Sequence, residues 1–137
     1  MVSHALVSAN FFILIDSVTR RLKTRLLGEV FGLFYLTPNL YFMILVMLII
    51  FLGFPGSLLF VAEFLFFSAL LDFSFCLFFI IFFVAYFFVP VCFFRSWFLL
   101  LFGFPTSALN ATLGRAPVSD LTTAEVLLTG TFIILLF

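Results

Sequence analysis

The residue of greatest chemical interest is a carboxylate in a long apolar segment. Residues 41–62 carry no charge, are interrupted by Gly53, Pro55 and Gly56, and are followed directly by Glu63. Proline removes a backbone donor and collides with the preceding turn, while glycine tolerates unusual backbone angles, so the pattern predicts a helix broken into two halves. A carboxylate inside hydrocarbon needs a basic or hydrated partner, or else stays protonated for much of the time. Both situations suit a proton carrier, so we predict proton transfer by Glu63, with a purely structural hydrogen bond as the alternative.

The single histidine, His4, is the second candidate for proton transfer. Histidine is a side chain that can relay protons, and a histidine satisfied by neighbouring backbone groups is the alternative. Asn10 and Asp16 follow at spacings of six residues, which place the three polar side chains on different faces of one helix. They therefore do not predict a shared site. We expect Asp16 to neutralise the basic residues that follow it.

The sequence offers no constellation for redox or hydrolytic chemistry. It has one histidine, no cysteine and histidine cluster with metal-ligand spacing, no glycine-rich phosphate loop and no serine backed by a base. Cys76 and Cys92 would be separated by about 24 Å along a helix, beyond disulfide reach. We therefore predict that this chain binds no metal or cofactor and that any enzymatic activity belongs to an assembly.

The composition places these residues in a membrane. The 137-residue chain is 66% hydrophobic and 9% charged, with 26 phenylalanines and a mean hydropathy of +1.45. A surface this apolar cannot face water, so the lipid bilayer is an expected partner. Six basic and six acidic side chains give a net charge of zero, and neither sign forms the extended face that nucleic acid requires. We expect no nucleic-acid binding.

We predict an all-α fold, a single membrane module over residues 1–137 with about four transmembrane helices. A span needs about 20 largely apolar residues, and only helices or closed barrels satisfy their backbones within the bilayer. The expected helices cover residues 2–19, 40–71, 73–97 and 121–137. The second is the helix broken at Gly53, Pro55 and Gly56. Because the link at Asp72 is short, the second and third helices should form a tight antiparallel hairpin.

The basic residues predict the orientation. With four crossings, the segment from Arg20 to Arg25 and the segment from Arg95 to Arg115 lie on one membrane face, while Asp72 and both chain ends lie on the other. All six lysine and arginine side chains then share a face, a pattern that marks the cytoplasm or the matrix of an organelle. Helical rise places Glu63 about 13 Å from the opposite interface. Glu63 is therefore expected in the outer half of the membrane.

Three groups of residues are distinctive: Gly53 to Leu65 around the break, Asp120 to Glu125 before the last helix, and His4 to Arg25 in the first helix. They resemble motifs of one family, subunit 4 of respiratory complex I, the proton-translocating NADH:ubiquinone oxidoreductase. The broken helix of that family reads Gly-x-Pro-Gly-Thr, a spacer, and Phe-x-x-Glu-Phe-Leu. The matching residues here are Gly53, Phe54, Pro55, Gly56 and Ser57, then Phe60, Glu63, Phe64 and Leu65. The family enters its final helix with Asp-Leu-Ser/Thr-x-x-Glu, and the matching residues are Asp120, Leu121, Thr122 and Glu125. Thr122 with Glu125 also predicts a capping box, with Asp120 as an alternative cap.

The third motif lies in the first helix. The family has His-Gly-Leu-x-Ser at its start and an acid, Arg, two variable residues, Ser or Thr, and Arg at its end. The matching residues are His4, Leu6, Ser8, Arg21, Thr24 and Arg25. Two positions depart from the pattern, since Ala5 replaces the glycine and Arg20 replaces the acid.

The resemblance implies a position and a role for this chain. Its four helices correspond to the eleventh through fourteenth of a fourteen-helix antiporter-like subunit, with Glu63 at the outlet of a proton half-channel and His4 on the central polar axis. The two sister subunits typically carry lysine where this chain has Glu63, so the glutamate indicates subunit 4. The expected function is the outlet part of a proton channel coupled to electron transfer from NADH to ubiquinone.

The resemblance also implies partners and a location. The earlier stations of the family, a glutamate and two lysines, are absent, so the chain is expected to be a split subunit or a fragment, completed by a chain that supplies the missing N-terminal helices. Other membrane-arm subunits of complex I are further expected partners. NADH, FMN, iron–sulfur clusters and ubiquinone would be held by other subunits. The expected location is the mitochondrial inner membrane with the basic loops in the matrix, or alternatively a bacterial or plastid membrane.

Two other functions remain open from the sequence. One is a structural four-helix module without proton handling, in which Glu63 tolerates glutamine and a larger residue at Gly56 disrupts assembly. The other is part of a stand-alone cation/proton antiporter.

Overall fold

The computed structural model describes residues 1–23, 32–103 and 120–137, and every regular element within these ranges is helical. The predicted all-α fold is confirmed. In chain order the elements are the helices α1 (Val2–Leu22), α2 (Leu33–Leu36), α3 (Pro38–Phe51), α4 (Leu58–Phe73) and α5 (Phe75–Phe83), the π-helical turn η2 (Val84–Phe88), and the helices α6 (Val89–Phe102) and α8 (Thr123–Leu135). Thr24, Arg25 and Arg115, which carried part of the sequence argument, lie outside the described ranges.

The predicted helix break is present between α3 and α4. Gly53 and Gly56 adopt positive φ angles of 80° and 98°, a region that residues with a Cβ rarely occupy. Ser57 then starts α4, because its hydroxyl accepts a hydrogen bond from the Phe60 N–H at 3.2 Å and donates one to the Phe54 carbonyl at 2.8 Å. One serine side chain thus satisfies two backbone groups that the break releases.

The hairpin of α4 and α5 turns at Ser74. The Ser74 N–H donates to the Leu70 carbonyl at the end of α4, and its hydroxyl accepts from the Leu77 N–H at the start of α5. Asp72, where the sequence placed the link, lies in the last turn of α4. The turn forms two residues later because serine can cap the next helix.

Two helices of the described ranges are long enough to cross a membrane, and two apolar helices are shorter. α5, η2 and α6 form one continuous helix of 28 residues, and α1 has 21; both are long and apolar enough to cross a bilayer. α3 has 14 residues and rises about 21 Å, so it spans only together with α4 across the break. α8 has 13 residues and rises about 20 Å.

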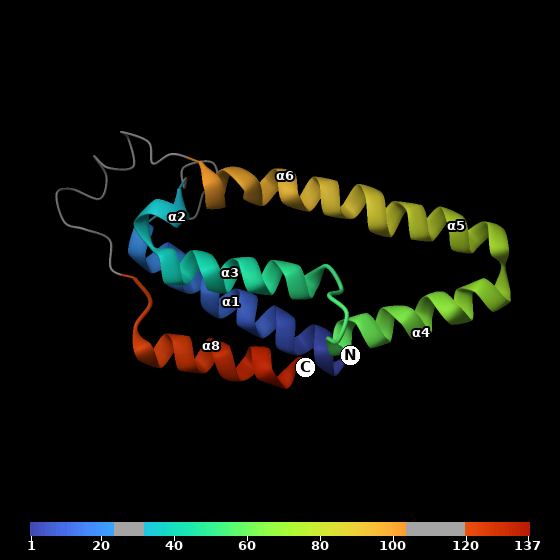
Figure 1. Ribbon diagram of the computed structural model, residues 1–137, viewed down its shortest axis with the longest axis horizontal. Helices are drawn as coiled ribbons and strands as arrows, with labels where there is room; N and C mark the ends of the chain where they lie inside the picture. Colours follow the sequence, from blue (N-terminus) through green and yellow to red (C-terminus); the bar gives the residue numbers. More distant parts are fainter. Residues whose placement is uncertain (24–31, 104–119) are drawn as a thin grey trace.

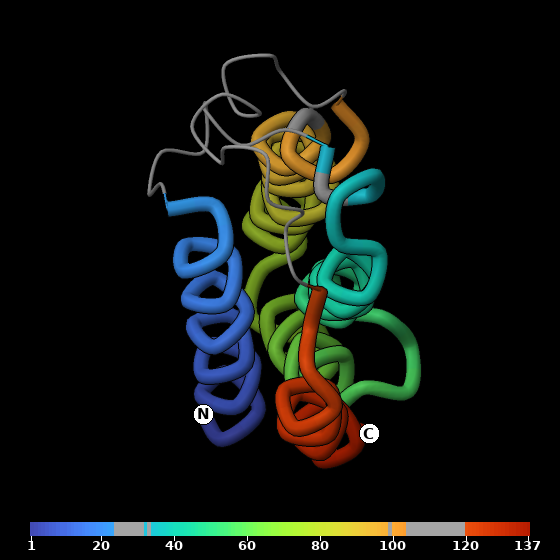
Figure 2. The backbone as a smooth tube through the Cα atoms, turned by 90° about the vertical axis from the view of Figure 1, so that its left-hand side faces the viewer, coloured from blue at the N-terminus to red at the C-terminus, as the bar shows by residue number. Residues whose placement is uncertain are grey.

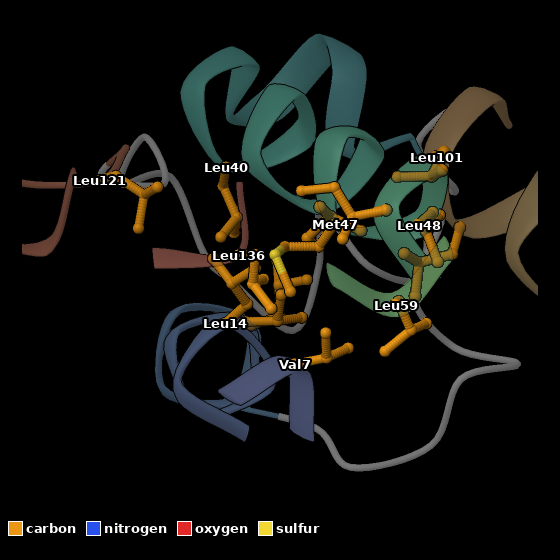
Figure 3. Packing of buried hydrophobic residues seen from close by; sticks show 14 residues of the cluster. Val7, Leu14, Leu40, Met47, Leu48, Leu59, Leu101, Leu121 and Leu136 are labelled. Atoms are coloured by element: carbon orange, nitrogen blue, oxygen red, sulfur yellow. The ribbon is translucent and has the colours of Figure 1, made fainter. Parts of the chain in front are cut away.

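The helices form an elongated bundle with an uneven core. Figures 1 and 2 show α1, α3 and α8 side by side at one end, with α6 on the other side of α3, while α4 and α5 extend beyond them. Figure 3 shows the buried cluster. Leu14 of α1, Leu40 and Met47 of α3, and Leu136 at the end of α8 belong to it. Along the fully described stretch 58–88, Leu59 alone is buried. The hairpin therefore turns most of its phenylalanine side chains outward, toward lipid or other helices.

The C-terminal residues contact the helix break. The Leu58 N–H, at the start of α4, donates to the Leu136 carbonyl at 2.8 Å. Leu136 is fully buried, and the ring of Phe137 meets that of Phe54 at a centroid distance of 6.5 Å. The end of α8 thus supplies an acceptor for one of the free donors at the start of α4.

Candidate functional site: the Glu63 cavity

Glu63 lies in the second turn of α4 and faces a tyrosine of the returning helix. Its side chain is partly buried. The Tyr86 hydroxyl, in the turn η2, donates a hydrogen bond to Glu63 Oε2 at 3.0 Å. The contact joins the two arms of the hairpin, and it gives the carboxylate a neutral donor.

A cavity of about 470 Å³ brings Glu63 and His4 together. It lies where the start of α1 and the end of α3 meet α4 and the long helix, and most of its lining is apolar. The polar side chains that line it are Ser3, His4, Glu63 and Tyr86. The two residues that the sequence selected for proton transfer therefore share one cavity, and their role in proton transfer stays a prediction.

Gly53 makes room for the carboxylate. A Cβ atom built on Gly53 would lie 2.5 Å from Glu63 Oε2 and 3.2 Å from Cδ, well inside van der Waals contact. The carboxylate therefore rests against the backbone of the helix break. The glycine both permits the positive φ of the break and leaves space for the acid that follows it.

Tyr86 was missed by sequence reasoning. It follows Glu63 by 23 residues, on the other arm of the hairpin, in a run of phenylalanines. Its approach to Glu63 depends on where the hairpin turns, which the sequence placed two residues too early, and on the π-helical geometry of η2, which has no sequence pattern. The available signal was modest: Tyr86 carries the one hydroxyl between Phe75 and Val91.

A second polar group, the Glu125 cluster, lies at the other end of the bundle and consists of Ser17, Arg20, Arg21, Asp120 and Glu125. Glu125 pairs with Arg21 at 2.6 Å and with Arg20 at 3.3 Å, and Arg20 also pairs with Asp16 at 2.9 Å. The predicted capping box of Thr122 and Glu125 is present. The expectation that Asp16 neutralises the following basic residues is confirmed for Arg20.

Asp120 caps a different helix from the one expected. Its carboxylate accepts hydrogen bonds from the Asn39 and Leu40 N–H groups at 3.1 and 3.2 Å, at the start of α3. The Arg21 guanidinium donates to the Asp120 carbonyl at 3.2 Å. Asp120, which precedes α8, is therefore hydrogen-bonded to both α1 and α3 at this end of the bundle.

Asn10 is buried between α1, α3 and α8. Its amide nitrogen contacts Met47 Sδ at 3.0 Å and donates to the Thr129 carbonyl at 3.4 Å. His4 and Asp16, by contrast, are exposed within the chain. His4, Asn10 and Asp16 thus face different surroundings, as their spacing predicts.

The cysteines and acids form no further site in the part of the chain that the structure describes. Cys76 and Cys92 are free, which confirms that they do not pair. No three His, Cys, Asp or Glu side chains cluster as metal ligands among those residues. The Glu63 cavity is thus the principal candidate site.

Comparison with known proteins identifies the family. No curated protein matches the sequence. A family model described as NADH:quinone oxidoreductase/Mrp antiporter, TM matches residues 1–89, a range that contains His4, the helix break, Glu63 and Tyr86. The matched range is more than half of the 137 residues. The chain is therefore a membrane protein that belongs to the transmembrane family of the NADH:quinone oxidoreductases and Mrp antiporters.

Proposed function

We propose that this chain is part of a subunit 4-like component of the membrane arm of complex I, where it contributes the outlet part of a proton channel. In this proposal proton movement is coupled to electron transfer from NADH to ubiquinone. The chain would take part in an enzyme as a subunit, and NADH, FMN, iron–sulfur clusters and ubiquinone would be held by other subunits. Membership of the family supports the general kind of protein, and the resemblance of the motif around Glu63 supports subunit 4.

One observation carries the proposal: Glu63 and His4 line the same cavity, beside a broken membrane helix. A carboxylate within the membrane is costly and is found mainly where ions or protons move. A broken helix is tolerated there only where protein or water satisfies the freed backbone groups. Both features occur together at this cavity.

The cavity is compatible with a proton step between the two residues. Water occupies about 30 Å³ per molecule in the liquid, so a volume of about 470 Å³ has room for several molecules between His4 and Glu63. In our proposal His4 passes a proton through such water to the Glu63 carboxylate, and Glu63 releases it toward the outer face.

The proposal includes partners and a location. A complete path needs several titratable stations across the membrane, so a second chain would supply the preceding helices and their glutamate and lysines. The mitochondrial inner membrane, with the basic ends in the matrix, is the proposed location. Copurification of a complex I assembly that contains such a chain would support both points.

A glutamine substitution tests the proton role. Glu63→Gln keeps the size of the side chain and its ability to accept a hydrogen bond but removes the exchangeable proton. In membranes that hold the assembled complex, we expect fewer protons translocated per electron from NADH to ubiquinone. The matched control is Asp72→Asn, which neutralises an exposed carboxylate in the last turn of the same helix and should leave the ratio unchanged. Normal assembly with an unchanged ratio in Glu63→Gln would refute the proposal and favour a purely structural module.

The family itself motivates a second candidate function. Its description includes Mrp antiporters as well as NADH:quinone oxidoreductases, so the chain is alternatively part of a stand-alone cation/proton antiporter. Sodium-dependent proton flux in vesicles without NADH would support this alternative. Proton movement that requires NADH oxidation and ignores sodium would support complex I.

A further inference from the structure

Two irregular backbone segments converge on the Glu63 carboxylate. On one side is the helix break, where Gly53 leaves space for Oε2. On the other side is the π-helical turn η2, which carries Tyr86 and its hydrogen bond to the same oxygen. Irregular turns are costly in membrane helices, so two of them beside one carboxylate call for an explanation.

The π-helical turn determines where Tyr86 lies. The Val89 N–H donates to the Val84 carbonyl, an i to i+5 bond that encloses Tyr86. A π-helical turn holds an additional residue, which displaces its side chains from their positions in a regular α-helix, and such turns occur frequently at functional sites. The regular helices on either side, α5 and α6, meet at this turn.

Neighbouring aromatic rings fix the tyrosine ring. Phe82, one turn earlier in α5, has its ring centroid 4.7 Å from that of Tyr86, and Phe67 of α4 has its centroid at 5.5 Å. Phe67 itself lies one turn after Glu63 on the same helix. The phenol ring is thus held by both arms of the hairpin, and its hydroxyl reaches the carboxylate.

We propose that Tyr86 is a positioning residue for Glu63, holding the carboxyl group at the wall of the cavity through its hydroxyl. This inference rests on the proposed function. The phenol keeps its own proton throughout and donates a hydrogen bond to Oε2, while the carboxyl group gains and then releases the transferred proton. Hydrogen bonds to an ionised acceptor are about twice as strong as neutral ones, so the contact holds the carboxylate in place after the proton has left.

Ring packing alone does not account for a tyrosine at this position. The contacts with Phe67 and Phe82 are made by the ring, and phenylalanine would preserve them. The hydroxyl adds a polar group to a largely apolar cavity, and its partner there is Glu63. The hydroxyl is therefore the part of the side chain to test.

The test compares Tyr86→Phe with Tyr41→Phe in membranes that hold the assembled complex. Tyr41, in the first turn of α3, belongs to the other end of the bundle, where its ring packs on Phe102. We expect Tyr86→Phe to slow NADH-driven proton translocation by about tenfold, the effect of losing one hydrogen bond to a charged group. Tyr41→Phe should leave the rate unchanged.

Two further measurements separate positioning from packing. The infrared carbonyl band of the protonated Glu63 carboxyl group, identified by its loss in Glu63→Gln, should shift in Tyr86→Phe and stay in place in Tyr41→Phe. In the double variant Glu63→Gln with Tyr86→Phe, proton translocation should match that of Glu63→Gln alone, because two residues that act as a unit are not additive. A Tyr86→Phe effect that persists in full in the Glu63→Gln background would overturn the inference.

The failure of this inference is distinguishable from failure of the proposed function. If Glu63→Gln lowers translocation while Tyr86→Phe changes neither the rate nor the infrared band, only the positioning role is wrong. If Glu63→Gln has no effect, the proton role of Glu63 falls and the positioning role falls with it.

Discussion

At the scale of single residues, the two glycines of the break have the same backbone requirement but different surroundings. Gly53 and Gly56 both have positive φ. A Cβ on Gly53 would collide with the Glu63 carboxylate, whereas a Cβ on Gly56 would meet no atom of the described residues within 4 Å. The expectation that a larger residue at Gly56 disrupts assembly, which belongs to the structural-module alternative, concerns contacts with other chains and stays a prediction.

The glycine pair gives a matched comparison. Gly53→Ala and Gly56→Ala should each cost about 1–2 kcal/mol, because alanine is strained in the left-handed region. Only Gly53→Ala should also displace Glu63 and lower the number of protons translocated per electron. Native gels run after graded heating report the stability, and proton uptake with NADH reports function. Equal proton ratios in the two variants, at equal assembly, would show that the carboxylate does not depend on the space at Gly53.

At the scale of the elements, the ion pairs of the Glu125 cluster join α1 to α8 at the end of the bundle opposite the Ser74 turn. Arg21 is largely buried, with 9% of its side chain exposed, and pairs with Glu125, which is 20% exposed. The pair of Arg20 with Asp16 is open to solvent, at 63% and 62%. Solvent-exposed pairs contribute little to stability, while removing one partner of a shielded pair leaves a charge without compensation.

Two substitutions separate these pairs. Glu125→Gln should lower the stability of the bundle by about 2 kcal/mol, the value of a hydrogen bond to a charged group. Asp16→Asn should change it by less than about 1 kcal/mol. The measurement is the temperature at which the extracted assembly loses this chain. A larger effect from Asp16→Asn than from Glu125→Gln would contradict the assigned importance of the shielded pair.

The elements also show what local sequence can and cannot predict. The break at Gly53, Pro55 and Gly56 and the capping box at Thr122 were predictable, because each depends on neighbours within one or two turns. The turn at Ser74 was displaced by two residues from Asp72, since helix ends depend on competing caps. Asp120 capping α3 and Tyr86 binding Glu63 join residues far apart in sequence, so they depend on packing that no local pattern encodes.

At the scale of the whole molecule, charge and burial are distributed unequally along the long axis. The Glu125 cluster, Lys23 and the start of α3 lie at one end, and the Ser74 turn lies at the other (Figure 1). Of the described basic residues, Arg20, Arg21 and Lys23 are near the first end, and Arg95 lies in α6, about two turns before that helix ends at Phe102. This arrangement agrees with an orientation in which the basic end faces the matrix or cytoplasm.

Site-directed labelling tests that orientation. In a background with Cys76→Ala and Cys92→Ala, a membrane-impermeant thiol reagent should label Asp72→Cys from the outer side only. Lys23→Cys should react only in inverted vesicles or after the membrane is opened, and it serves as the opposite-face control. Labelling of Asp72→Cys from the basic side would show that the proposed topology is wrong.

The contact between the chain's last residues and the helix break has a practical consequence for purification. The Leu136 carbonyl is the acceptor for the Leu58 N–H, and Phe137 packs on Phe54. An affinity tag joined directly to Phe137 would add bulky, hydrated residues beside the start of α4, only five residues before Glu63. A tagged preparation could therefore lose activity without any change in Glu63, His4 or Tyr86, so recombinant work should separate the tag from Phe137 by a long flexible spacer.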